Sequence, residues 1–119
     1  MFKYYNVNPF DLHVPDCVCR AISLATDSDY YNIAMLLHRN GANNDCEELC
    51  VDCYSRLLAD VGYKKIHADG QTVREIAKKY QKQILLIRIN GHLTCSLYGV
   101  VHDIWDCSDK KADVFWIID

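Results

Sequence analysis

The sequence predicts an α+β fold in one domain that spans residues 1–119. In the first eighty residues, apolar side chains recur every three or four positions, and helix-capping residues separate these stretches. From residue 84 the pattern changes to short, β-branched runs that end in turn pairs. This order, with helices in the first part of the chain and a β-meander in the second, is typical of helices packed on a C-terminal antiparallel sheet.

Four helices are expected, and each begins after a recognisable start signal. Pro15 disfavours a helix before it, and Asp16 is the expected N-cap of the first helix. Asn40-Gly41 is expected to stop the second helix, and Thr72 to cap the fourth. The predicted helices cover about 17–25, 29–39, 46–61 and 73–80.

The change in the spacing of apolar residues after residue 83 predicts the strands. The runs separated by Asn90-Gly91, by Gly99 and by the polar segment 108–111 have strand length, and residues 1–16 form an extended or looped lead-in. The predicted strands cover 84–89, 92–97, 100–105 and 114–118, with a possible short strand at 63–67.

The bulk composition excludes several partners. A formal charge of −3 with interspersed basic residues gives no basic stripe, so neither nucleic acid nor an anionic membrane surface is expected to bind. No apolar run approaches the roughly 20 residues that span a bilayer, and the N-terminus lacks the apolar block of a signal peptide. The expected location is cytoplasmic.

Seven cysteines, an odd number, favour free thiols in a cytoplasmic protein. Cys46, Cys50 and Cys53 would share one face of the third helix, so a zinc site with His38 or His67 is an alternative. Structural zinc sites usually take their cysteines from turns, so small apolar filling of the helix is the preferred interpretation. No metal and no cofactor are therefore expected.

Cys17 is the candidate nucleophile because it would lie in the first helical turn, where free N–H groups and the helix dipole favour a thiolate. A catalytic thiol also needs a base and a group that orients the base. Among the five histidines, His92 opens a strand directly after a tight turn. A three-residue hairpin loop, 98–100, would place His92 opposite Asp106 on the same face. A two-residue loop would turn Asp106 to the other face.

These residue types suggest distinct roles. Cys17 would attack, His92 would carry the proton, and Asp106 would fix the imidazole tautomer. The backbone N–H of Cys17 is one expected oxyanion donor, and the side chain of Asn8 is the most plausible second donor.

Three motifs together carry a family resemblance: Asp16-Cys17 at a helix start, Gly91-His92-Leu93-Thr94 at a strand start, and Ile104-Trp105-Asp106 at the end of its hairpin partner. The chain resembles the papain-like cysteine peptidases, above all the small peptidase domains of the bacteriocin-processing type and short phage-encoded relatives. The resemblance implies a papain-like fold and a thiol hydrolase that cleaves peptide or isopeptide bonds, in the host cytoplasm if the protein is phage-encoded.

Two departures from the family pattern leave alternatives open. Papain-like enzymes usually carry a glutamine some six residues before the nucleophile, where this chain has Asp11. Cys19 could also serve as nucleophile, although Cys17 lies nearer the helix start. The alternative function is a catalytically silent papain-like fold that binds a protein, such as a phage-encoded inhibitor of a host protein.

Overall fold

The computed structural model describes all 119 residues and has an α+β fold of four helices and six strands. In chain order the elements are β1 (Phe2–Tyr4), α1 (Cys17–Ala25), α2 (Tyr30–Asn44), α3 (Val51–Val61), β2 (Lys65–His67), α4 (Val73–Lys79), β3 (Ile84–Ile89), β4 (His92–Leu97), β5 (Val100–Asp103) and β6 (Ala112–Ile117). None of the helices has the length and apolar character that crossing a membrane requires.

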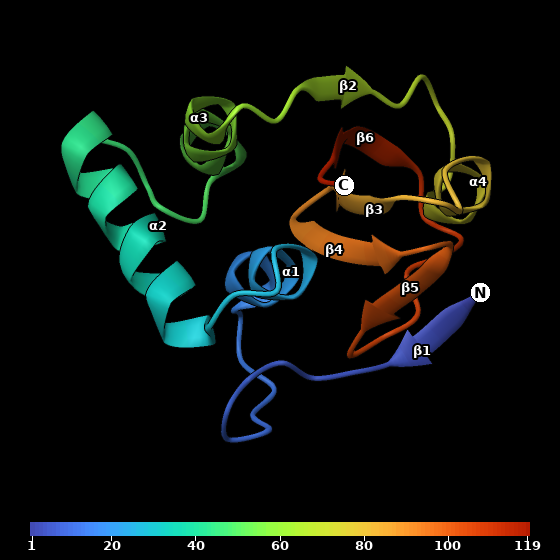
Figure 1. The fold of residues 1–119 in the computed structure, drawn as a ribbon, viewed down its shortest axis with the longest axis horizontal. Coiled ribbons are helices and arrows are strands. Elements are labelled where there is room, and N and C mark those ends of the chain that lie inside the picture. The colour runs from blue at the N-terminus through green and yellow to red at the C-terminus, as the bar shows by residue number, and fades with distance from the viewer.

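The six strands form one mixed sheet in the order β1-β5-β4-β3-β6-β2 (Figure 1). All neighbouring strands are antiparallel except β1 and β5, which run parallel at one edge. The expectation of a purely antiparallel, C-terminal sheet is therefore wrong at both edges. The lead-in supplies β1, and the segment before α4 supplies β2.

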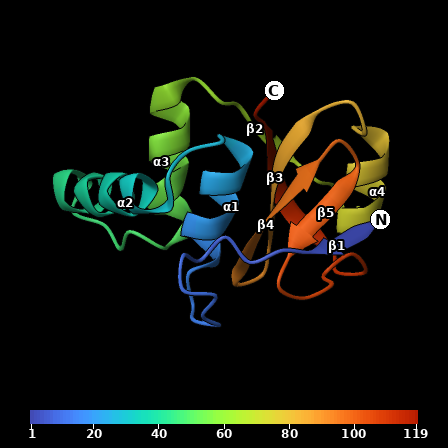
Figure 2. The same cartoon turned by 60° about the horizontal axis from the view of Figure 1, so that its bottom comes forward.

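Helices cover both faces of the sheet. In Figure 2, α1, α2 and α3 lie on one side of the sheet and α4 lies on the other. Each face has its own apolar core, and α1 packs directly on β4. Leu86 of β3 belongs to the first core, whereas its neighbour Leu85 belongs to the second, as the alternation of a strand requires.

Helix α2 passes through the predicted stop at Asn40-Gly41 and ends only at Asn44, where Asp45 is left-handed with φ 52°. Gly41 does not end the helix but allows the following loop to pack closely against it. A Cβ atom at this position would lie 2.9 Å from the carbonyl oxygen of Cys46. The glycine therefore lets the chain fold back tightly against the helix that it has just left.

The third helix is shorter than predicted because it begins at Val51 instead of residue 46. Cys46 lies in the preceding loop and forms a disulfide with Cys53 of α3, so the expectation that all seven cysteines are free thiols is wrong. The disulfide also takes two of the three thiols of the alternative zinc site, which leaves Cys50 alone and exposed.

The hairpin of β4 and β5 turns through two residues instead of three. Leu97 pairs with Val100, and the turn residues Tyr98 and Gly99 have φ angles of 51° and 85°. Two positive φ angles are typical of the tight turn that matches the twist of a two-residue hairpin. Strand β5 then ends at Asp103, two residues earlier than predicted.

Candidate active site

Cys17 is the first residue of α1, and the cap before it leaves the helix N-terminus open. Asp16 occupies the N-cap position, but its side chain forms no capping hydrogen bond. Its carboxylate instead accepts hydrogen bonds from Arg20 Nε at 2.6 Å, Tyr30 Oη at 2.8 Å and Asn8 Nδ2 at 3.0 Å. The first N–H groups of α1 therefore have no side-chain acceptor and remain available to an anion.

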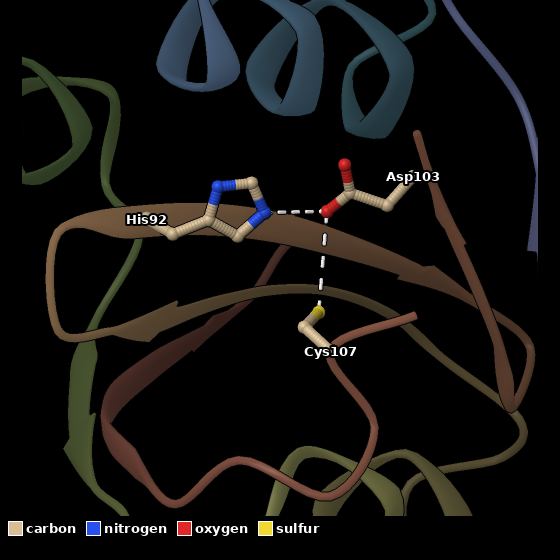
Figure 3. Close-up of side chains that lie close together, drawn as sticks. All are labelled: His92, Asp103 and Cys107. Carbon is tan, nitrogen blue, oxygen red and sulfur yellow. Dashed lines mark hydrogen bonds and ion pairs between the residues drawn. The ribbon is translucent and has the colours of Figure 1, made fainter. Parts of the chain in front are cut away.

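His92 opens β4, as predicted, and links a carboxylate to the nucleophile. Its Nε2 lies 2.6 Å from Oδ2 of Asp103. The other ring nitrogen, Nδ1, points toward α1 in Figure 3. The neighbouring His92 lowers the pKa of the Cys17 thiol, and both residues line one groove. The structure thus brings the predicted Cys17 and His92 together.

The predicted carboxylate does not join them. Asp106 lies beyond the end of β5, is exposed, and accepts a hydrogen bond from the backbone N–H of Ser108 at 3.0 Å. The two-residue turn explains this outcome, because a shift of one residue moves a side chain to the other face of the hairpin. The assignment of Asp106 as the partner of His92 is therefore wrong.

Asp103 is the carboxylate partner of His92 because of the same two-residue hairpin register. Cys95 pairs with His102, so the next pair toward the strand start is Thr94 with Asp103. His92 lies two residues before Thr94 on the same face and is a diagonal neighbour of Asp103. The positive-φ chemistry of a Tyr-Gly turn was the signal in the sequence that could have identified Asp103.

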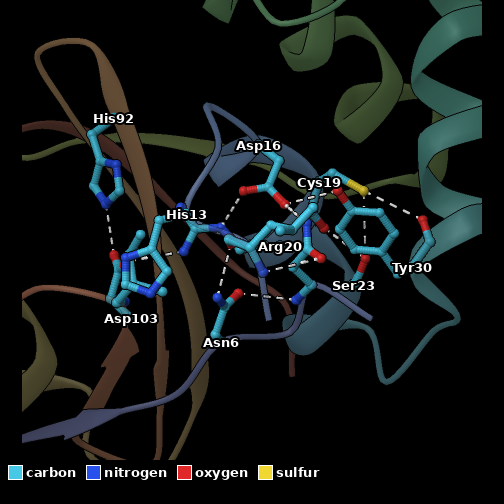
Figure 4. Close-up of polar contacts among 12 residues, drawn as sticks. Asn6, His13, Asp16, Cys19, Arg20, Ser23, Tyr30, His92 and Asp103 are labelled. Atoms are coloured by element: carbon cyan, nitrogen blue, oxygen red, sulfur yellow. Dashed lines mark hydrogen bonds and ion pairs between the residues drawn. The ribbon is translucent and has the colours of Figure 1, made fainter. Parts of the chain in front are cut away.

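Arg20 is a further member of the site that the sequence analysis missed. Its side chain is buried, donates from Nε to Asp16, and reaches Oδ1 of Asp103 with Nη1 at 3.3 Å (Figure 4). One guanidinium thus joins the start of α1 to the end of β5. An arginine within an otherwise apolar helix, four residues after an aspartate, was the available signal.

The ionisation of the site follows from these contacts. Burial disfavours the thiolate, but the polar and positive neighbours His92, the backbone of Leu93 and Arg20 outweigh it, so the pKa of Cys17 lies below its ordinary value. Burial likewise disfavours the imidazolium, yet the hydrogen bond to Asp103, together with the nearby thiols of Cys107 and Cys17, raises the pKa of His92 to about 11. These directions favour a thiolate and imidazolium pair.

Cys19, the alternative nucleophile, is in a different environment. It is buried, and its thiol donates to the backbone carbonyl of Tyr30 at 3.3 Å. Burial raises the pKa of Cys19 to about 11, which opposes formation of a thiolate. The geometry therefore favours Cys17.

Asn8, the expected second oxyanion donor, is buried with its side chain already engaged. Its amide nitrogen donates to Asp16, and its Oδ1 accepts from the backbone N–H of Phe10 at 2.9 Å. The amide holds the N-cap carboxylate in place instead of pointing at a substrate. Donors for an oxyanion must then come from the backbone at the start of α1.

A groove of about 370 Å³ runs beside Cys17 and His92. Its walls are mostly apolar, with one arginine and one exposed thiol among them. Besides the two site residues, the lining consists of Pro15, Val18, Leu49, Cys50, Val51, Tyr54, Arg88, Gly91 and Leu93. An extended segment of a peptide could lie along this groove against the thiol.

A second thiol lies next to the pair of His92 and Asp103. Cys107 is fully buried, and its Sγ lies 4.0 Å from Oδ2 of Asp103 (Figure 3). The three side chains offer one sulfur, one nitrogen and one oxygen atom, all within 4.8 Å of one another.

Comparisons of the chain with protein-family models, with curated proteins and with solved structures gave no match.

Proposed function

We propose that the protein is a thiol-dependent hydrolase of papain-like type that cleaves a peptide or isopeptide bond with Cys17, His92 and Asp103. The observation that carries this proposal is the imidazole of His92, which lies between the Asp103 carboxylate at 2.6 Å and the thiol of Cys17. A nucleophile, its base and a group that orients the base are the three parts that such catalysis needs.

In this mechanism the thiolate of Cys17 attacks the carbonyl carbon of the scissile amide and forms a C–S bond. The free N–H groups at the start of α1 stabilise the negative charge on the carbonyl oxygen. Imidazolium His92 then protonates the leaving amine as the C–N bond breaks, which leaves a thioester on Cys17. His92 next takes a proton from water, which attacks the thioester and releases the acid and the thiolate.

Asp103 and Arg20 act on the orientation of the base. The bond from Asp103 to Nε2 keeps Nδ1 directed at Cys17 and stabilises the imidazolium. Arg20 binds the second oxygen of the same carboxylate and so limits its rotation.

Selective alkylation tests this proposal. With less than one equivalent of iodoacetamide at a pH of about 6, we expect Cys17 to be modified faster than Cys50, because its pKa is lowered whereas an ordinary thiol near 8.5 is almost fully protonated. Peptide mass spectrometry gives both rates in one sample, and exposed Cys50 is the internal reference. In H92A the advantage of Cys17 should disappear.

Equal rates at Cys17 and Cys50 in the unsubstituted protein would overturn the hydrolase proposal. They would favour the second candidate, a catalytically silent papain-like fold that binds a peptide or protein, such as a host protein, in the same groove. One observation favours this candidate, namely the engagement of Asn8 with Asp16, which removes the side-chain donor that the sequence predicts for the oxyanion.

A further inference from the structure

We propose that His92, Asp103 and Cys107 bind a divalent transition metal of the zinc class, and that the bound ion switches off the site. The binding itself is independent of catalysis, whereas the inhibition rests on the proposed function.

The donor set matches zinc. Imidazole nitrogen, thiolate sulfur and carboxylate oxygen are the three ligand types that Zn²⁺ takes from proteins. Here one of each lies within 4.8 Å of the others, from two strand ends and the segment after β5. Three protein ligands leave a fourth position of the tetrahedron for water.

The separations between the three ligand atoms would have to change by at most about 1.5 Å, because all of them lie within 4.8 Å of one another. Ligand atoms around tetrahedral zinc lie about 3.3 to 3.5 Å apart, given metal–ligand bonds of about 2.0 to 2.3 Å. The separation of His92 Nε2 and Asp103 Oδ2 is 2.6 Å, and that of Asp103 Oδ2 and Cys107 Sγ is 4.0 Å. The observed values lie on either side of the ideal. An ion would open the first contact and close the second, each by less than about 1 Å.

Cys107 has no other evident polar role. Its side chain is fully buried, and its only side-chain hydrogen bond is the long contact to Asp103. The backbone around it is held on both sides, because Lys110 N–H donates to the Cys107 carbonyl at 3.0 Å and Arg74 N–H donates to the Ser108 carbonyl at 2.9 Å. The thiol is thus fixed beside the carboxylate.

The charges around the cluster also permit a cation. Apart from His92, whose Nε2 proton the ion would displace, Arg20 is the nearest positive group, but its shorter ion pair, at 2.6 Å, is with Asp16. Its contact with Asp103 is longer, at 3.3 Å, and uses Oδ1. Oδ2, the oxygen that faces His92 and Cys107, therefore remains available to a metal.

Metal at this position would stop catalysis through His92. Nε2 would bind the ion instead of Asp103, and the only proton of the ring would lie on Nδ1. Such an imidazole cannot take up the proton of an attacking water, and the thiolate of Cys17 loses the imidazolium beside it. The ion therefore acts as a reversible inhibitor of the proposed hydrolase.

Cobalt titration tests the binding. In a C50S background, which removes the exposed thiol, we expect Co²⁺ to give the near-ultraviolet thiolate-to-metal charge-transfer band, and Zn²⁺ to displace it. C107A should lose the band and at least about 10- to 100-fold in affinity, since even outer-shell changes cost that much. C95A is the matched control, because it also removes one fully buried free thiol.

The C17A variant distinguishes a metal bound by Cys107 from a metal bound by the thiol of Cys17. Retention of the band in C50S/C17A, together with its loss in C50S/C107A, supports the proposal. The reverse pattern, or no band in the C50S protein, overturns it. Zn²⁺ should also slow alkylation of Cys17 in C50S and not in C50S/C107A. Cobalt binding without faster alkylation of Cys17 would reject the hydrolase and keep the metal site.

Discussion

The carboxylate of Asp103 is shared by two cationic groups, and its position determines the charge on His92. One oxygen binds Nε2 and the other faces Arg20, so the side chain cannot rotate without losing one partner. Burial opposes ionisation of Asp103, but the hydrogen bond and positive charge of His92 and the backbone N–H of Ile104 outweigh it and keep the pKa of this carboxyl below its ordinary value. An ionised Asp103 in turn stabilises the imidazolium.

D103N tests this role through the pH profile of Cys17 alkylation. In the unsubstituted protein the pKa of Cys17 is lowered, so the thiolate persists at pH values below the pKa of an ordinary thiol. Alkylation of Cys17 therefore stays fast at these pH values. An amide stabilises the imidazolium less than a carboxylate does, because it carries no negative charge, so the rise of the rate should move to higher pH in D103N. We expect at least about a tenfold slower reaction near pH 6, which corresponds to one pKa unit.

D106N is the control, because Asp106 is exposed and its carboxylate accepts its hydrogen bond from the backbone N–H of Ser108, away from His92. Its profile should match that of the unsubstituted protein. A shift in D106N of the same size as in D103N would contradict the assignment of Asp103.

At the level of elements, α1 carries the candidate nucleophile Cys17 and is anchored to the sheet by the buried charge of Arg20. Arg20 contacts Asp16 at the start of its own helix and Asp103 at the end of β5. All three side chains are at most about one-tenth exposed, so neither carboxylate has water as an alternative partner. The cation therefore pairs with two buried anions, and for Asp16 it is the only cationic partner.

R20M should destabilise the protein by about 3–5 kcal/mol, because removal of one partner leaves buried charges uncompensated. Urea unfolding followed by circular dichroism measures this change. R74M provides the comparison, since Arg74 pairs with Asp109 at an exposed position, where such pairs contribute about 0–1 kcal/mol. Equal losses in both variants would show that the buried network does not anchor α1.

The elements also show what local sequence could and could not predict. The bounds of α1, β3 and β4 are confirmed, because caps, turn pairs and periodicity agree there. The third helix was predicted too long because the Cys46–Cys53 disulfide and the tight packing at Gly41 are tertiary constraints. Strand β1 was missed because only its parallel pairing with β5 defines it.

The site was predictable to the extent that its parts were local. Cys17 follows from a helix start and His92 from a turn pair, so the sequence was sufficient for both. The identity of the carboxylate that binds His92 depends on the register of the β4–β5 hairpin. One extra loop residue changes which side chains share a face with His92. Arg20 needed the contact between α1 and β5, which only the assembled fold provides.

At the scale of the whole molecule, one sheet serves two cores. The first lies under α1 to α3 and includes Leu86, and the second lies under α4 and includes Leu85. Both leucines are fully buried on β3, which is a central strand with neighbours on both sides. Loss of packing on either face should therefore weaken the same set of strand pairings.

We accordingly expect L85A and L86A to destabilise the protein by similar amounts, about 2–5 kcal/mol each, although the two side chains point to opposite faces. Unfolding should stay a single transition, because neither core can persist without the shared sheet. Trp116, which is buried in the first core, reports on that face by fluorescence, while circular dichroism reports on all elements. If L85A separated the two transitions, the α4 face would unfold by itself and the active-site face would be an independent unit.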